Sequence, residues 1–193
     1  MTASGPPHDF WAAFRAEADE LARKIAAGDL RGPFQRVESL LDEHGLQFCF
    51  DLTEEGHDAV LVLTPEGDHE QARLVDDLLG AMPPIAGWRV YGRRQRKPLK
   101  DAFTFVRHVY GRDVSDATFS LQEADAGVVV TMHSAAMGGL SDEEVAGLVA
   151  TFLDHALGED VVMDRVSGVA AGDGSGHLSA QDLITSLSRV DRA

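Results

Sequence analysis

The residues best suited to binding chemistry form a basic segment in the middle of the chain. Residues 88–100 contain six of the 17 basic residues and no acidic residue. Guanidinium groups beside aromatic rings suit capture of a phosphate, a carboxylate or an acidic partner surface. The candidate ligand-binding residues, at a strand end spanning 88–97, are Trp88, Arg89, Tyr91, Arg93, Arg94 and Arg96.

A second interpretation of this basic segment is purely structural. In a strand, Arg89, Tyr91 and Arg93 point to one face, whereas Trp88 and Val90 point to the other. Under this interpretation Trp88 belongs to the core, and the arginines pair with carboxylates of the same chain or protect an edge strand.

The histidines and the cysteine show no spacing that defines a catalytic or metal site. The eight histidines lack the i, i+4 and HExxH patterns of helical metal sites. His133 alternates with Thr131 on a predicted strand, and His155 lies in the last turn of a predicted helix, so a hydrolase with a histidine base remains an alternative. Cys49 lies between two phenylalanines and is expected to be inert. We predict no catalytic residue, no metal and no cofactor.

Residues 173–183 resemble the later part of a calcium-binding loop. In that alignment the first ligand position is Ala171, which has no side-chain oxygen, and the last is Asp182, which is shorter than the usual glutamate. We therefore expect a loop followed by a helix that Ser179 caps together with Asp182.

The composition restricts the class of protein. The chain has 193 residues, 44% of them hydrophobic, and a formal charge of −15 from 32 acidic and 17 basic residues. Such a surface repels phosphate backbones, so general nucleic-acid binding is not expected. No apolar stretch is long enough for a membrane span, and Met1–His8 do not resemble a signal peptide. We expect a cytoplasmic protein without membrane association.

The hydrophobic periodicity predicts an α+β fold. Helices are predicted over residues 9–27, 33–44, 68–82, 98–110, 141–157 and 179–190. Strands are predicted over residues 46–53, 60–64, 88–93, 119–121, 128–133 and 161–166. The order hairpin, helix, strand therefore occurs twice, which indicates an internal duplication unless ββαβ order recurs by chance.

Three regions follow from this order. Residues 1–45 are expected to form a helical hairpin, and residues 46–169 a core domain of two ββαβ units that build one mainly antiparallel sheet. Residues 170–193 are expected to form a glycine-rich link and a C-terminal helix.

Two stretches resemble the signatures of a bacterial protein family of unknown function. Residues 87–95 are similar to the signature GWxxxxxRQ, and residues 153–159 are similar to LDxxLGE. The resemblance covers residues 46–169. It implies no activity, so it assigns no role to any residue.

The leading functional hypothesis is a non-enzymatic, cytoplasmic module that binds a basic protein, as an inhibitor, an immunity-like protein or a regulator would. Its basis is the formal charge of −15, which favours association with basic surfaces. The alternatives are a small-anion or ligand-binding domain that uses the basic strand end at 88–97, and a hydrolase with a histidine base. The sequence leaves the oligomeric state open.

Overall fold

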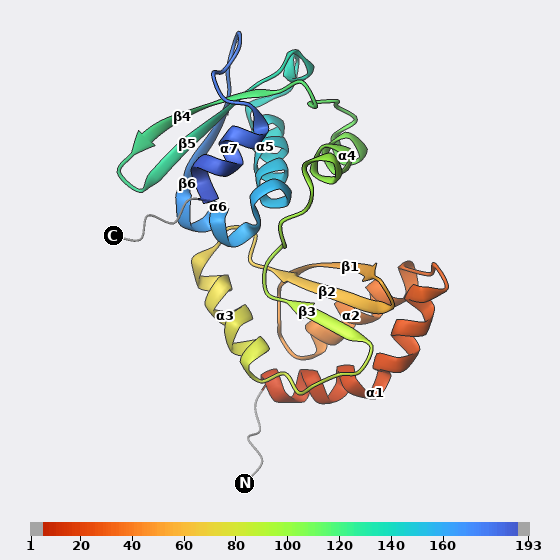
Figure 1. Cartoon of the computed structure of the whole chain (residues 1–193). Helices are drawn as coiled ribbons and strands as arrows, with labels where there is room; N and C mark the ends of the chain where they lie inside the picture. Colours follow the sequence, from red (N-terminus) through yellow and green to blue (C-terminus); the bar gives the residue numbers. More distant parts are fainter. Residues whose placement is uncertain (1–5, 189–193) are drawn as a thin grey trace. The chain divides into compact units, whose positions relative to one another are not determined.

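The computed structural model describes residues 6–188 and contains two compact units (Figure 1). Unit 1 comprises the residues up to Arg93, and unit 2 begins at Arg94. Among the described residues, no helix combines the length and the apolar character that crossing a membrane requires.

Unit 1 contains two helices, a strand hairpin, a third helix and a third strand. These are α1 (Pro6–Ala26), α2 (Arg31–Glu43), β1 (Cys49–Glu55), β2 (Asp58–Thr64), α3 (His69–Gly80) and β3 (Trp88–Tyr91). The strand order is β1-β2-β3. The central strand β2 is antiparallel to β1 and parallel to β3. Asp68 caps α3, because its carboxylate accepts hydrogen bonds from the N–H groups of Glu70 (2.7 Å) and Gln71 (3.1 Å).

The N-terminal helices share one hydrophobic core with the first sheet. Phe10, Trp11 and Phe14 of α1 are fully buried and belong to the same core as Leu61. The Trp11 indole N–H donates to the carbonyl of Leu78 at 2.6 Å. Packing therefore joins the predicted helical hairpin to the first ββαβ segment, and the compact units do not follow the predicted boundary at residue 45.

Unit 2 repeats this arrangement with additional elements. It contains α4 (Leu99–Tyr110), β4 (Thr118–Ala124), β5 (Gly127–His133), the short 3₁₀ helix η1 (Ala135–Met137), α5 (Asp142–Leu157), α6 (Glu159–Arg165), β6 (Val166–Ala171) and α7 (Ala180–Ser188). The strand order is β4-β5-β6, with β4 antiparallel and β6 parallel to β5. Phe152 of α5 stacks on both Phe103 (5.1 Å between ring centroids) and Phe119 (5.4 Å) in the core.

The predicted α+β class is confirmed, with helices at the N-terminal side and a helix near the C-terminal side. The prediction of a single sheet needs correction, because the six strands in residues 6–188 form two separate three-stranded sheets. Each sheet is mixed, because its central strand has one antiparallel and one parallel neighbour. The two hairpins have the same register, with the pairs Glu55–Asp58 and Ala124–Gly127 closing two-residue turns.

The predicted last strand also needs correction. Residues 161–165 are helical, and β6 continues to Ala171, inside the predicted link. Gly158, with φ 90°, ends α5 and starts α6, and two acidic residues follow it in the first turn, where the helix dipole favours them. The predicted end of the last helix at Val190 lies outside the described residues.

Candidate functional site

The candidate residues Trp88, Arg89 and Tyr91 lie on β3 of unit 1. Trp88 is buried, and its indole N–H donates to the carbonyl of Ala18 at 3.0 Å. Val90 packs on the same core, so the predicted alternation of β3 is confirmed. The indole belongs to the core, whereas Arg89 and Tyr91 lie on the opposite face of the sheet.

The guanidinium of Arg89 pairs with two carboxylates of the adjoining hairpin. It donates to Asp58 at 2.9 Å and lies 3.2 Å from Glu55. The pKa of Arg89 is raised, first by the hydrogen bond to Asp58, then by a hydrogen bond to Tyr91 and by the negative charge of Glu55. The same hairpin that is hydrogen-bonded to β3 thus supplies the counter-charges of Arg89.

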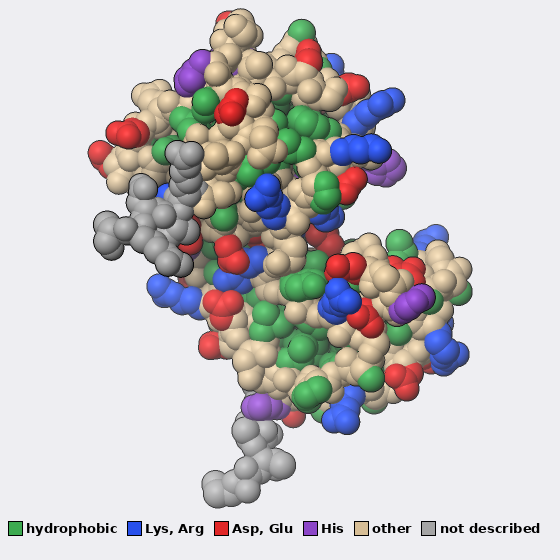
Figure 2. All heavy atoms as spheres, in the orientation of Figure 1, with side chains coloured by type: hydrophobic (Ala, Val, Ile, Leu, Met, Phe, Trp, Pro, Cys, Tyr) green, Lys and Arg blue, Asp and Glu red, His purple; other side chains and the backbone are tan. Residues whose placement is uncertain are grey.

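Arg93, the last residue of unit 1, pairs with α3. Its guanidinium lies 3.2 Å from the carboxylate of Asp76 and 3.4 Å from the carbonyl of Ala72. Only 12% of the Arg93 side chain is exposed, so this group is oriented towards the helix and not towards solvent. Figure 2 shows basic and acidic side chains interspersed on the visible face of the molecule, with no continuous basic patch.

Arg94 and Arg96 belong to unit 2. The Arg94 guanidinium pairs with Asp154 at 3.5 Å, and both side chains are less than one-fifth exposed. Arg96 is exposed, and no ion pair involving it occurs in residues 6–188. Carboxylates of the same chain therefore pair with the guanidinium groups of Arg89, Arg93 and Arg94. Because these groups already have counter-charges, the anion-binding alternative gains no support.

The end of the first signature stretch and the two residues after it contact the second stretch inside unit 2. The N–H of Arg94 donates to the carboxylate of Glu159 (3.0 Å), and the N–H of Glu159 donates to the carbonyl of Arg94 (3.0 Å). The N–H of Lys97 donates to the carbonyl of His155 at 2.7 Å. A Cβ at Gly158 would lie 3.3 Å from the Arg96 nitrogen, so glycine permits this close approach. These contacts give Gly158 and Glu159 of the second stretch a structural reason.

A serine and a histidine come together on the second sheet. Ser120 Oγ and His133 Nε2 are 2.9 Å apart on β4 and β5, and this contact was not predicted from the sequence. The register of the hairpin could have indicated it, since Ser120 is opposite Thr131, two residues before His133. His133 Nδ1 is buried without a hydrogen-bond partner, and a Cβ at Gly172 would lie only 2.5 Å from it. Within the described chain the pair therefore lacks the carboxylate that would orient a catalytic imidazole.

The segment that resembles a calcium-binding loop pairs with β4 through Leu178 and caps α7 through Ser179. Ser179 Oγ donates to Asp182 at 2.6 Å, and the N–H of Asp182 donates to Ser179 Oγ at 3.2 Å, which confirms the predicted cap. The hydrogen bonds that the Ser179 hydroxyl (2.6 Å) and the Ser179 N–H (3.3 Å) donate to the carboxylate lower the pKa of Asp182. No group of three or more histidine, cysteine, aspartate or glutamate side chains in residues 6–188 is arranged to hold a metal ion.

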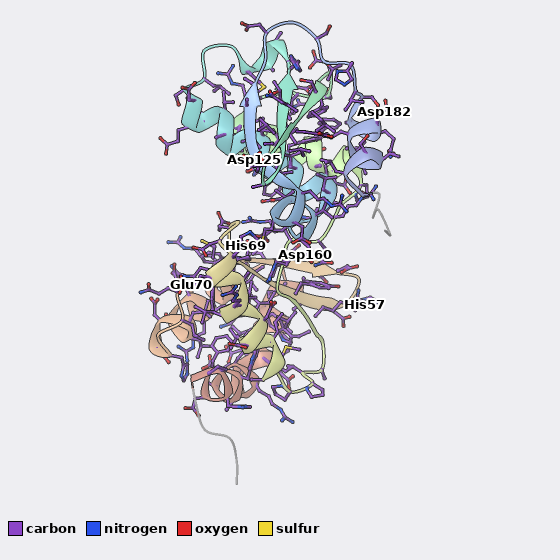
Figure 3. All side chains as sticks on the ribbon, turned by 90° about the vertical axis from the view of Figure 1, so that its left-hand side faces the viewer. His57, His69, Glu70, Asp125, Asp160 and Asp182 are labelled. Carbon is purple, nitrogen blue, oxygen red and sulfur yellow. The ribbon has the colours of Figure 1, made fainter. Side chains whose placement is uncertain are left out.

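Exposed carboxylates occur on elements of both units. Glu70 on α3, Asp125 in the β4–β5 turn and Asp182 on α7 are all exposed and come from separate elements (Figure 3). Glu54 and Glu55 are exposed at the end of β1. The net negative charge is therefore distributed over the surface.

The comparisons with known proteins give no further guide to function. No protein-family model matches the sequence, and neither the search of curated proteins nor the search of solved structures gave a significant match. A functional conclusion for this chain therefore depends on its own geometry and charge.

Proposed function

We propose that the chain is a non-enzymatic binding module that recognises a basic protein. The observation that carries the proposal is the internal pairing of the basic segment. The formal charge is −15, and three of the arginines that could offset it locally pair with carboxylates of their own unit. The remaining surface attracts basic partners by long-range electrostatics.

The two alternatives lack comparable support. An anion-binding site at 88–97 would need guanidinium groups that face a common ligand, yet Arg89, Arg93 and Arg94 pair with Asp58, Asp76 and Asp154. A hydrolase would need a histidine with an orienting carboxylate, and His133 Nδ1 has no hydrogen-bond partner within residues 6–188. Recognition of a basic surface requires neither arrangement.

Affinity purification followed by kinetics tests this proposal. The tagged full-length chain is used at low salt to isolate partners, which are identified, purified and measured for association rate. We expect a basic partner whose association rate falls at least about tenfold between about 50 and 300 mM salt, because steering by exposed charges is screened over a Debye length. A rate that changes less than about twofold, or partners that are all acidic, would contradict the proposal.

A further inference from the structure

The outer edge of β4 in unit 2 is occupied by the chain itself. Phe119 and Leu178 form an antiparallel bridge in which the N–H of Phe119 donates to Leu178 (2.8 Å) and the N–H of Leu178 donates to Phe119 (3.0 Å). The N–H of Gly176 donates to Thr118 Oγ1 at 2.8 Å. Leu178 also packs against the core of unit 2. A short extended segment thus lies where a fourth strand of this sheet would lie.

β1 holds the equivalent position in unit 1. Both hairpins are closed by two-residue turns, and both run seven residue pairs without a register shift, so Phe50 of β1 corresponds to Phe119 of β4. Because alternate residues of an antiparallel strand direct their N–H and C=O groups to opposite sides, those of Phe50, Leu52 and Glu54 point away from β2. Within residues 6–188, no backbone segment pairs with these groups.

Among the features that usually protect an edge strand, β1 has charged side chains but lacks the others. Its sequence contains no lysine, proline or glycine, and its pairing with β2 has no bulge. The charged side chains of β1 are all acidic, namely Asp51, Glu54 and Glu55, and Glu55 pairs with Arg89 of the same sheet. Acidic side chains along this edge disfavour pairing with a second copy of the same strand and favour a basic one.

An exposed apolar side chain contacts Phe50 of this edge, and a second lies one helical turn from it. Phe34 of α2 is 40% exposed and stacks on Phe50 with 4.4 Å between ring centroids. Leu30, one helical turn earlier, is 46% exposed. These are two of the five large apolar residues that remain exposed in residues 6–188. An apolar side chain of an added strand, placed opposite Phe50, would contact these residues, as Leu178 contacts the core of unit 2.

We propose that the outer edge of β1 binds an extended basic segment of the partner protein as an added antiparallel strand. An apolar residue of that segment lies opposite Phe50 and contacts Phe34, and the residues on either side of it are lysine or arginine. This inference rests on the proposed function and assigns it a surface. Main-chain hydrogen bonds provide the affinity, and the alternation of basic and apolar side chains provides the specificity.

A synthetic peptide, Lys-Val-Lys-Leu-Lys-Val-Lys, is the probe for this inference. Its binding to the full chain is measured by fluorescence anisotropy, with the sequence Glu-Val-Glu-Leu-Glu-Val-Glu as the control. We expect the basic peptide to bind and to slow hydrogen exchange at the amides of Phe50, Leu52 and Glu54. Binding of both peptides alike, or exchange protection at other strands, would overturn the inference.

Glu54 provides a matched pair of variants. Glu54→Pro removes an N–H that points away from β2, so it removes a bond to the peptide while leaving the β1–β2 ladder intact. Glu54→Gln keeps the N–H and removes only the charge. We expect Glu54→Pro to bind the basic peptide about three- to tenfold more weakly than Glu54→Gln, the loss that one hydrogen bond causes. Circular dichroism confirms that both variants are folded.

The remaining outcomes separate this inference from the proposed function. If a basic partner protein associates in a salt-dependent manner but Glu54→Pro and Glu54→Gln bind the probe equally, the β1 edge is not the site and only the inference fails. If no basic protein associates at all, the proposed function fails. Sedimentation that shows a dimer lost in Glu54→Pro would assign the edge to a second copy and overturn the inference.

Discussion

The two ββαβ segments have the same arrangement of strands but differ in the side chains on their third strands. Strand order and hairpin register are the same, yet Trp88, Arg89 and Tyr91 of β3 correspond in register to Val166, Gly168 and Ala170 of β6. The outward face of β3 is therefore charged and internally paired, whereas that of β6 has small side chains. One arrangement of strands thus supports two surfaces of different chemistry.

The edges of the two sheets differ in the same way. The β4 edge pairs with Leu178, while the β1 edge has no backbone partner in the described part of the chain. The cost of leaving an edge unpaired is a tendency to pair with other chains, which unit 2 avoids with its own segment and unit 1 limits with carboxylates. This difference is why we assign partner binding to unit 1.

The largest expected effect comes from Trp88→Ala in unit 1. The change removes a buried indole and its hydrogen bond to Ala18, so we expect a loss of about 3–5 kcal/mol in the free energy of unfolding. Fluorescence of Trp11 in urea follows unit 1, because both tryptophans belong to that unit. The matched change Val166→Ala affects a half-buried side chain and should cost much less. Similar losses in the two variants would show that the third strands are energetically equivalent.

An intermediate effect is expected when the edge of unit 2 is disturbed by Gly176→Ala. A Cβ at Gly176 would lie 2.4 Å from the carbonyl oxygen of Phe119, so the segment must move and lose its hydrogen bonds. We expect a loss of about 1–3 kcal/mol by urea denaturation and faster hydrogen exchange at Phe119. Gly80→Ala is the control, because a Cβ there meets open space and helix propensity favours it. An unchanged exchange rate at Phe119 would mean that the bridge contributes little.

The smallest effect concerns an ion pair between helices of unit 1. The Arg36 guanidinium donates twice to Glu17, at 2.8 and 2.6 Å, and this contact lowers the pKa of Glu17. Because the folded pKa lies below the unfolded value, the stabilisation is complete above the unfolded pKa and is lost as pH falls through the folded pKa. Both side chains are one-third exposed, so we expect Arg36→Gln to cost only about 0.5–1 kcal/mol at pH 7.

The pH dependence of that cost provides the measurement. Thermal unfolding of the wild type and of Arg36→Gln should differ at pH 7 and converge in acid, where Glu17 is protonated in both states. The control in unit 2 is Arg107→Gln, because Arg107 is exposed and lies 3.9 Å from Asp113. A difference that persists unchanged in acid would show that Arg36 acts through packing and not through its charge.

Local features of the fold could be predicted from the sequence. The caps at Asp68, Ser141 and Ser179 depend on residues at most three positions apart, and the predicted cap at Ser179 is confirmed. The predicted end of the helix at residue 110 is confirmed as well, because Gly111 follows it in the left-handed conformation that suits glycine. Helix α6 was missed because the alternating residues 161 and 163 resemble a strand over so short a length.

Long-range pairing could not be predicted. Alternation along β3 correctly placed Trp88 opposite to Arg89 and Tyr91, but nothing in the sequence identifies which carboxylates would pair with the arginines. Asp58 comes from β2, Asp76 from α3 and Asp154 from α5. The separation of the six strands into two sheets was missed for the same reason, since alternation records which face of a strand is buried but not which strand lies beside it.

The position of Leu178 in the chain has a consequence for proteolysis. The bridge that closes the β4 edge follows a loop in which Asp173, Gly174 and Ser175 are exposed, where a protease could cut. After cleavage there, only the packing of α7 and the bridge itself would hold the Leu178 segment, and its departure would turn unit 2 into a second domain with an unpaired edge. An unpaired edge is a template for pairing with other chains, so loss of the segment after a single nick would give unit 2 a tendency to associate that the intact edge does not have.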